Sequence, residues 1–203
     1  SSRLGMPHMP PSGVSGLDLY ARDAKGKWRW AAATLPAKQE MQVTLLRGIK
    51  PDLREYALYL PLYNGTESLA VGVPARSNFQ GLAPRKVRPL VFYGTSITQG
   101  ACASRPGMAY PAILGRWLDM PVINIGFSGA GKMHEEVGDL MVEVDATAYI
   151  IDCLPNMNGA MVTKRCVPLV NQLREAHADT PIVLVEDRRF PNSWLVPDKS
   201  KYH

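Results

Sequence analysis

Three short segments of the sequence place a hydroxyl or amide side chain at the end of an apolar run, and the first two also carry glycines there. The first reads Gly94-Thr95-Ser96-Ile97-Thr98-Gln99-Gly100 and follows the apolar run 90–93. A serine just past a strand can present its hydroxyl and its backbone N–H together, as a nucleophile in acyl transfer must. Taken alone, the segment also fits an ordinary strand-to-helix loop with capping Ser and Thr. It is not the G-x-S-x-G elbow of α/β-hydrolases, because position 98 is Thr.

The other two segments also place polar groups at the ends of apolar runs. The second, Asn124-Ile125-Gly126-Phe127-Ser128-Gly129, closes the run 122–127. The third, Asp152-Cys153-Leu154-Pro155-Asn156-Met157, follows the run 149–152. An Asn after Pro can be a turn residue, or it can aim its amide N–H₂ at a developing oxyanion.

The second segment has a competing interpretation. Gly126–Lys132 matches G-x-x-x-x-G-K, the phosphate loop, and the run 149–152 resembles the acidic strand that supports Mg²⁺ beside such loops. Position 133 is Met, however, where the phosphate loop needs a Ser or Thr hydroxyl as a Mg²⁺ ligand. This hypothesis also leaves the first and third segments unexplained.

Together the three segments resemble the SGNH hydrolase (GDSL-type esterase) superfamily, in the subgroup with an N-terminal β-sandwich domain. The resemblance covers the chain from about Gly13 onward, and the first segment departs from the commoner Gly-Asp-Ser opening because Thr95 replaces Asp. By this resemblance, Ser96 is the nucleophile. The backbone N–H groups of Ser96 and Gly129 and the side chain of Asn156 then form the oxyanion hole.

The resemblance also implies a function. It predicts a serine ester hydrolase that acts on small acyl esters, with carbohydrate O-acetyl groups as candidate substrates, through an acyl-enzyme. It implies no cofactor, no metal, a small-molecule or glycan ester as partner, and a secreted or periplasmic location. Two alternatives stay open: a non-catalytic glycan-binding or truncated, inactive member of the same fold, and nucleotide binding through Gly126–Lys132.

The resemblance leaves the catalytic base without a matching residue in this sequence. The family supplies it from an Asp-x-x-His segment near the C-terminus, and no such pattern occurs in this sequence. The histidines are His8, His134, His177 and His203, and the nearest candidate carboxylates toward the C-terminus are Asp187 and Asp198. None matches the family position, so we expect a chain truncated relative to the family, with its His and Asp base unknown. A serine at its free pKa needs such a base to act as a nucleophile.

Strand and helix patterns alternate after Pro89. Apolar runs at 90–93, 122–127, 149–152 and 182–185 predict strands, and helical periods fall at 133–144 and 162–173, with a weaker helix at 108–118. We place Pro168 in the first turn of its helix, where a proline is tolerated. The pattern predicts a three-layer α/β fold with a flavodoxin-like parallel sheet, whose ligands bind at the carboxyl ends of the strands.

The preceding residues alternate with the period of strands. We predict strands at 16–22, with Leu17, Leu19 and Ala21 on one face, and at 28–33, 42–46 and 54–63, with a further alternation at 69–73. Short strands separated by turns indicate a β-sandwich. The predicted domains are therefore a sandwich at 1–75 that begins abruptly, a linker at 76–88 and the hydrolase domain at 89–203.

Charge and composition further narrow the classes of protein to which the chain can belong. The 203 residues carry a net charge of +5, split as +7 over residues 1–89 and −2 over residues 90–203. The basic half fits a solvated surface or a patch for acidic glycans, and no nucleic-acid motif accompanies it. No run reaches the ~20 apolar residues of a membrane span. Cys102, Cys153 and Cys166 form neither a disulfide framework nor a zinc pattern, so we expect free thiols, or one disulfide and one free thiol.

Overall fold

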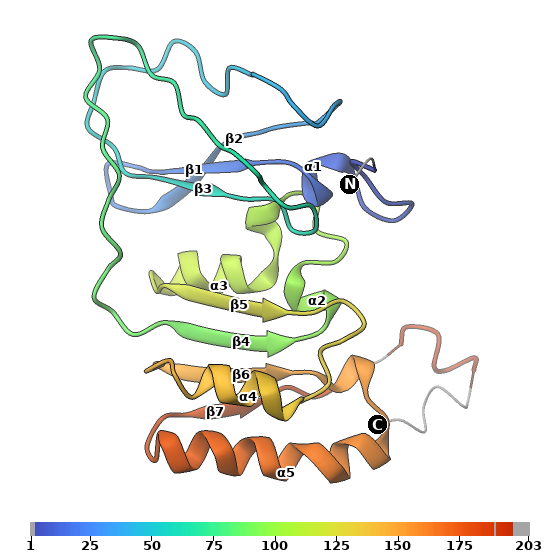
Figure 1. Ribbon diagram of the computed structural model, residues 1–203. Coiled ribbons are helices and arrows are strands. Elements are labelled where there is room, and N and C mark those ends of the chain that lie inside the picture. The colour runs from blue at the N-terminus through green and yellow to red at the C-terminus, as the bar shows by residue number, and fades with distance from the viewer. Residues whose placement is uncertain (1–2, 189, 197–203) are drawn as a thin grey trace. The chain divides into compact units, whose positions relative to one another are not determined.

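The computed structural model describes residues 3–188 and 190–196 and divides them into two compact units (Figure 1). One unit contains the described residues up to Val87 together with Gly100–Asp119. The other contains Arg88–Gln99 and the described residues from Met120 onward. The segment Gly100–Asp119 therefore folds with the N-terminal unit, although it lies between two strands of the other unit in the sequence.

The second unit is built on a parallel sheet. Its strands are β4 (Leu90–Gly94), β5 (Val122–Gly126), β6 (Ala148–Asp152) and β7 (Ile182–Leu184), in the order β5-β4-β6-β7. All five residues of β4 are buried, which explains why the central strand is a continuous apolar run in the sequence. The four strands predicted after Pro89 are confirmed.

Helices α4 (Glu135–Met141) and α5 (Gly159–Ala176) contact each other and pack against one face of this sheet (Figure 1). Met141 from α4 and Leu169 and Leu173 from α5 form a buried core with side chains of β4 and β6. Two shorter elements, α2 (Ser96–Gln99) and the 3₁₀ helix η2 (Leu154–Asn156), follow β4 and β6. The core thus fixes the strands whose carboxyl ends carry the candidate residues.

The placement of Pro168 in a first turn was wrong. Pro168 lies in the middle of α5, because the helix begins earlier than predicted, with Asn158 as its N-cap accepting the N–H of Met161 at 3.0 Å. A proline inside a helix costs about 3 kcal/mol. Burial of Leu169 and Leu173 directly after it offsets that cost, since each buried leucine contributes about 1.5–3 kcal/mol.

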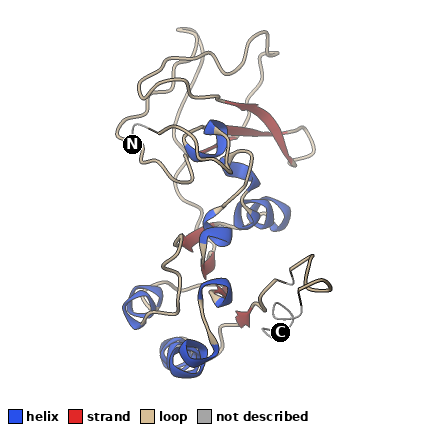
Figure 2. Ribbon diagram, turned by 90° about the vertical axis from the view of Figure 1, so that its right-hand side faces the viewer, coloured by secondary structure: helices blue, strands red, loops and turns tan. Residues whose placement is uncertain are grey.

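The N-terminal unit contains an antiparallel sheet of three strands. They are β1 (Asp18–Arg22), β2 (Trp28–Ala33) and β3 (Tyr56–Tyr59), in the order β2-β1-β3. The unit also holds α1 (Pro11–Val14), the 3₁₀ helix η1 (Pro106–Met108) and α3 (Tyr110–Leu118). Figure 2 shows that long loops surround its strands. The predicted fold class, an α/β parallel sheet preceded by an N-terminal β-sandwich module, is confirmed for the parallel sheet, and the described N-terminal residues form one antiparallel sheet of three strands.

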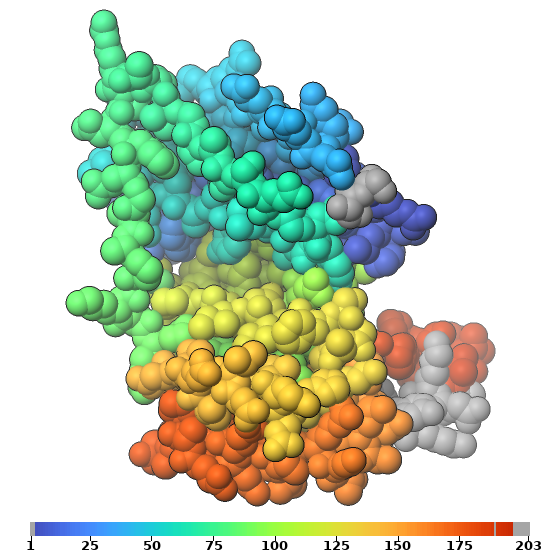
Figure 3. Space-filling view, in the orientation of Figure 1, coloured from blue at the N-terminus to red at the C-terminus, as the bar shows by residue number. Residues whose placement is uncertain are grey.

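Two predicted strands of this unit are wrong. Residues 42–46 and 69–73 form neither helix nor strand, and their alternating apolar side chains Val43, Leu69, Val71 and Val73 are exposed. Residues 71–88 are exposed throughout and form no helix or strand, as their position on the surface in Figure 3 illustrates. Alternation of apolar residues allows a strand, but a strand also needs a hydrogen-bonded neighbour.

The two faces of β1 differ in burial. Asp18 and Tyr20 are buried, whereas Leu17, Leu19 and Ala21 are half-buried. The carboxyl group of Asp18 has hydrogen-bond partners inside the unit, which makes its burial possible.

Candidate active site

The three predicted site residues lie at one edge of the parallel sheet. β4 is the strand between β5 and β6, and Gly94 at its end is the register partner of both Gly126 and Asp152. Because all three strands run in parallel, the segments that follow them leave the sheet at the same edge. These segments carry Ser96, Gly129 and Asn156, respectively.

Ser96 is the first residue of α2 and is half-buried. Thr95, which replaces the Asp of the commoner motif, is fully buried before it. The Thr95 hydroxyl accepts the N–H of Ile97 at 3.2 Å, and its carbonyl accepts the N–H of Gln99 at 3.0 Å. These bonds close a tight turn directly after the strand, so the position of Ser96 is fixed by its neighbours.

Glycines allow α2 to lie against the strand ends. A Cβ on Gly94 would be 1.9 Å from Oγ1 of Thr98, and one on Gly126 would be 2.1 Å from the backbone nitrogen of Gln99. Neither separation is possible without moving α2. Both positions therefore require glycine, because α2 lies too close to the strand ends for a side chain to fit between them.

Gly129 lies in a compact turn after β5. The carbonyl of Phe127 accepts the N–H groups of Ala130 at 3.1 Å and Gly131 at 2.9 Å, and the side chain of Gln99 accepts the N–H of Ser128 at 2.9 Å. Gly129 itself is exposed with φ +73°, a backbone conformation that favours glycine. Its N–H has no hydrogen-bond acceptor among the described residues, which leaves it available to a ligand.

Asn156 ends η2, where its N–H donates to the carbonyl of Cys153 at 3.1 Å. Its side-chain nitrogen Nδ2 is buried and has no hydrogen-bond partner within the described part of the chain. A buried donor left without a partner costs about 1–3 kcal/mol. Such a cost is typical of positions where a bound molecule supplies the acceptor.

Side chains at this edge of the sheet form hydrogen bonds between the three segments, a role that the sequence alone does not predict. The Thr98 hydroxyl donates to Oδ2 of Asp152 at 3.0 Å, with both side chains buried. Nδ2 of Asn124 donates to the carbonyl of Thr98 at 2.8 Å, and its Oδ1 accepts the N–H of Gly126 at 2.9 Å. A polar residue inside or at the end of an apolar strand run was the signal available for Asn124 and Asp152.

The histidines of the described chain make contacts that do not involve Ser96, Gly129 or Asn156. His134 is the N-cap residue of α4, and its N–H donates to the hydroxyl of Tyr93 at 3.0 Å. A ring nitrogen of His177 lies 2.9 Å from the carbonyl of Val142, and its ring packs near Tyr149. His8 is exposed in the N-terminal unit.

Asp187, one of the two candidate carboxylates for the base, forms an ion pair with Arg188 at 2.9 Å. Asp198 and His203 lie outside the described residues. The structure therefore assigns no described residue as the catalytic base.

The phosphate-loop interpretation of Gly126–Lys132 is not supported by the local geometry. A Cβ on Gly131 would be 1.8 Å from the carbonyl oxygen of Gly94, so the loop packs down on the end of β4. Met133, in the place of the Mg²⁺-binding hydroxyl, is buried in the core. A phosphate loop needs an open cradle of N–H groups and that hydroxyl.

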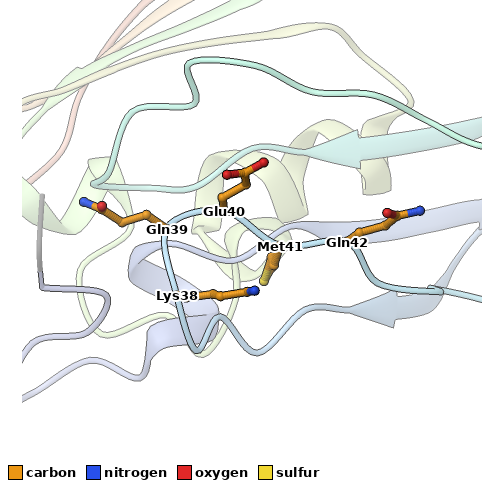
Figure 4. Close-up of a pocket in the computed structure, with 5 residues that line it drawn as sticks. All are labelled: Lys38, Gln39, Glu40, Met41 and Gln42. Carbon is orange, nitrogen blue, oxygen red and sulfur yellow. The ribbon is translucent and has the colours of Figure 1, made fainter.

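Other features of the described residues add no competing site. Cys102, Cys153 and Cys166 are free thiols, and burial raises the pKa of Cys153 to about 12, which disfavours its thiolate form. No group of three metal-ligating side chains occurs in the described residues, and no described helix is both long and apolar enough to cross a membrane. A hollow in the N-terminal unit is lined only by consecutive residues of one surface loop, Lys38–Gln42, whose side chains diverge in Figure 4.

Known sequences and structures resemble the chain over both units. A sequence profile of the GDSL-like lipase/acylhydrolase family matches residues 87–203. A second profile, for the N-terminus of SGNH-type esterases and named GxDLY, matches residues 1–79. The chain has that motif at Gly16-Leu17-Asp18-Leu19-Tyr20. No curated protein matches the chain.

Two solved structures share the fold. A protein from Bacteroides ovatus ATCC 8483, assigned as a GDSL-like lipase, is 38% identical with a TM-score of 0.90 over 97% of this chain. The salicylyl-acyltransferase SsfX3 from a tetracycline biosynthetic pathway is 19% identical with a TM-score of 0.59 over 96% of this chain, a similarity of fold alone. The chain spans 58% and 57% of the lengths of these two proteins. The chain belongs to the GDSL-like lipase/acylhydrolase family, as the resemblance of its three segments predicted.

Proposed function

We propose that this chain carries the nucleophile and the oxyanion hole of a serine esterase that acts on small acyl esters. Membership of the lipase/acylhydrolase family supports ester hydrolysis as the reaction class. The observation that carries the assignment of residues is the buried Nδ2 of Asn156, which has no partner among the described residues. It lies on the segment after β6, at the same sheet edge as Ser96.

In the proposed reaction, Oγ of Ser96 attacks the acyl carbonyl carbon, and the hydroxyl proton passes to a general base. The carbonyl oxygen becomes an oxyanion that accepts hydrogen bonds from the N–H groups of Ser96 and Gly129 and from Nδ2 of Asn156. The alcohol leaves with the proton, and water then hydrolyses the acyl-serine to release the acid. Each oxyanion donor is typically worth about 3 kcal/mol of barrier. The family resemblance predicts a His and Asp base for this step, and no described residue is assigned to that role.

Hydrolysis of p-nitrophenyl acetate by the full-length gene product tests this proposal. We expect turnover by the wild type, and a loss of roughly 10³-fold or more in kcat for Ser96→Ala. Ser68→Ala is the matched control, because Ser68 is exposed on a loop of the N-terminal unit. Turnover by Ser96→Ala at the wild-type rate would refute the assignment of the nucleophile. Glycan binding without any turnover would support the non-catalytic alternative.

For the substrate class we propose small acyl groups, with carbohydrate O-acetyl esters as the natural candidates. The proposal follows from family resemblance and from the basic N-terminal half, whose charge fits an acidic glycan. Acetate release from acetylated polysaccharides, measured beside p-nitrophenyl acetate and p-nitrophenyl butyrate, tests it. A strong preference for the butyrate, with no acetate released from any polysaccharide, would count against it. A secreted or periplasmic location is also proposed from the resemblance, and cell fractionation tests it.

A further inference from the structure

Asp18 is a fully buried carboxyl group of the N-terminal unit to which the proposed function gives no role. Its Oδ1 accepts the indole N–H of Trp30 at 3.0 Å, and its Oδ2 accepts the backbone N–H of Gly107 at 2.9 Å. Nε of Arg105 lies 3.3 Å from Oδ2 as an ion-pair partner. Asp18 thus connects strands β1 and β2 with η1.

Gly107 and Arg105 belong to the segment Gly100–Asp119, and the contact with Gly107 is close. A Cβ on Gly107 would be 2.8 Å from Oδ2 of Asp18 and 2.5 Å from Cε2 of Tyr20. The guanidinium of Arg116, from the same segment, stacks on the Tyr20 ring at 3.9 Å and donates to the carbonyl of Gly107 at 2.6 Å. The residues of β1 therefore hold the middle of this segment by directional contacts.

Both ends of the segment are also held within the N-terminal unit. A Cβ on Gly100 would be 2.7 Å from a methyl carbon of Leu62, so Gly100 lies directly against that side chain. At the other end, Arg22 donates to Asp119 at 2.6 Å. The whole segment is fixed by residues that come before β4 in the sequence.

The segment Gly100–Asp119 is joined directly to the helix that Ser96 begins. Gly100 is the residue that follows α2, whose first residue is Ser96, and Asp119 precedes β5, which leads to Gly129. The backbone thus enters the N-terminal unit directly after the nucleophile helix and leaves it just before the strand of the second oxyanion donor. We infer that Asp18 is a positioning residue for the serine site, which acts by holding Gly107 and with it the segment that joins α2 to β5.

This inference rests on the proposed function. A carboxylate suits the role because it accepts two N–H donors in different directions at once, which an apolar side chain of the same volume cannot do. Burying a charge is costly unless its partners compensate, and such groups often specify one arrangement of the chain. A misplacement of about 1 Å in a catalytic group can cost roughly 10²-fold in rate, so a small shift at Gly100 has a measurable effect.

The test compares Asp18→Asn with the wild type in the full-length protein, at a temperature where circular dichroism shows both to be folded. Asn keeps one acceptor oxygen but turns an N–H₂ group toward one of the two donors and loses the ion pair with Arg105. We expect kcat on p-nitrophenyl acetate to fall roughly tenfold or more with KM little changed. Amide hydrogen exchange over Ser96–Met108 should become faster by about tenfold, while exchange in β6 stays at the wild-type rate.

Two further variants keep the test decisive. Trp30→Phe removes the indole donor to Asp18 and keeps an aromatic ring where Arg105 lies 5.0 Å from the Trp30 ring. It should shift kcat and exchange in the same direction by a smaller factor. Asp23→Asn is the matched control, because Asp23 belongs to an exposed turn of the same unit, and its kcat should match the wild type. Wild-type kcat in a folded Asp18→Asn protein, or unchanged exchange over Ser96–Met108, overturns the positioning role and leaves the proposed function intact. If instead wild-type hydrolysis does not depend on Ser96, the proposed function fails, and this inference fails with it.

Discussion

The hydroxyl of Thr98 donates a hydrogen bond of 3.0 Å to Oδ2 of Asp152, and both side chains are buried. Thr98 belongs to α2, the helix that Ser96 begins, and Asp152 ends β6, the strand that leads to Asn156. The bond therefore ties the segment of the proposed nucleophile to the segment of the proposed oxyanion donor. Two residues with no part in the proposed chemistry thus link the segments of the residues that the proposal assigns to it.

Replacing Thr98 with valine should cost both stability and activity. The substitution keeps the shape of the side chain but removes a buried hydrogen bond to a carboxyl group, which is worth about 1–3 kcal/mol. Urea unfolding should show that loss, and kcat should fall because this bond between α2 and β6 is lost. Thr163→Val is the matched control: Thr163 is exposed on α5, and the change should stay within about 0.5 kcal/mol. Equal effects of the two substitutions would contradict this role of Thr98.

Replacing Gly126 with alanine should displace the nucleophile helix. The new Cβ would be 2.1 Å from the backbone nitrogen of Gln99 and 2.6 Å from its Cα, and backbone atoms cannot move aside cheaply. We expect a stability loss of about 1–3 kcal/mol and a reduced kcat. Gly72→Ala, at an exposed position where nothing lies within 4 Å of the added Cβ, should leave both quantities unchanged. A Gly126→Ala protein with wild-type stability and kcat would show that α2 does not lie this close to β5.

Replacing Asn156 or Asn158 with alanine should separate catalysis from stability at two neighbouring positions. Nδ2 of Asn156 has no partner to lose among the described residues, so Asn156→Ala should keep its stability while kcat falls roughly 10²–10³-fold. Asn158 caps α5, so Asn158→Ala should lose about 1 kcal/mol of stability and keep its kcat. Thermal unfolding and steady-state kinetics on the two variants check both statements. A stability loss without a rate effect in Asn156→Ala would make that residue structural.

Two aspartates of the N-terminal unit should respond to pH with opposite sign. Burial raises the pKa of Asp18, although the N–H of Gly107 and the charge of Arg105 oppose this shift. Its stability contribution is therefore present below its ordinary pKa and lost as pH rises through the raised value. The hydrogen bonds from Arg29 and from the N–H of Lys27 lower the pKa of Asp23 to about 2. The contribution of Asp23 is present above its ordinary pKa and lost as pH falls toward about 2.

Urea unfolding of the wild type, Asp18→Asn and Asp23→Asn from about pH 2 to about pH 7 tests these signs. The difference between the wild type and Asp18→Asn should shrink as pH rises. The difference between the wild type and Asp23→Asn should grow over the acidic part of the same range. Two differences that change in the same direction would contradict one of the two shifts.

The parallel sheet could be predicted from the sequence because β4 is buried along its whole length and β6 is buried or half-buried. β4 and β6 are continuous apolar runs that end in a glycine or a polar residue, and their order along the chain alternates with helical periods. The same logic placed Ser96, Gly129 and Asn156 at one edge, since parallel strands share their carboxyl ends.

The N-terminal unit was harder to predict because its contacts depend on pairs that are far apart in the sequence. Asp18 was overlooked, since its burial depends on a bond from Trp30 and on one from Gly107, which lies 89 positions later in the sequence. Val43 and Leu69 lie in alternating runs that find no neighbouring strand. The link between Thr98 and Asp152 likewise spans 54 positions, which no local pattern contains.

The central claim is that Ser96 is an activated nucleophile, and labelling with a fluorophosphonate probe tests it most directly. Mass spectrometry of the labelled full-length protein should show one adduct, located on the peptide that contains Ser96. The Ser96→Ala variant should show none, and Ser68→Ala should label like the wild type. No adduct on the wild type, or an adduct that persists in Ser96→Ala, would contradict the account.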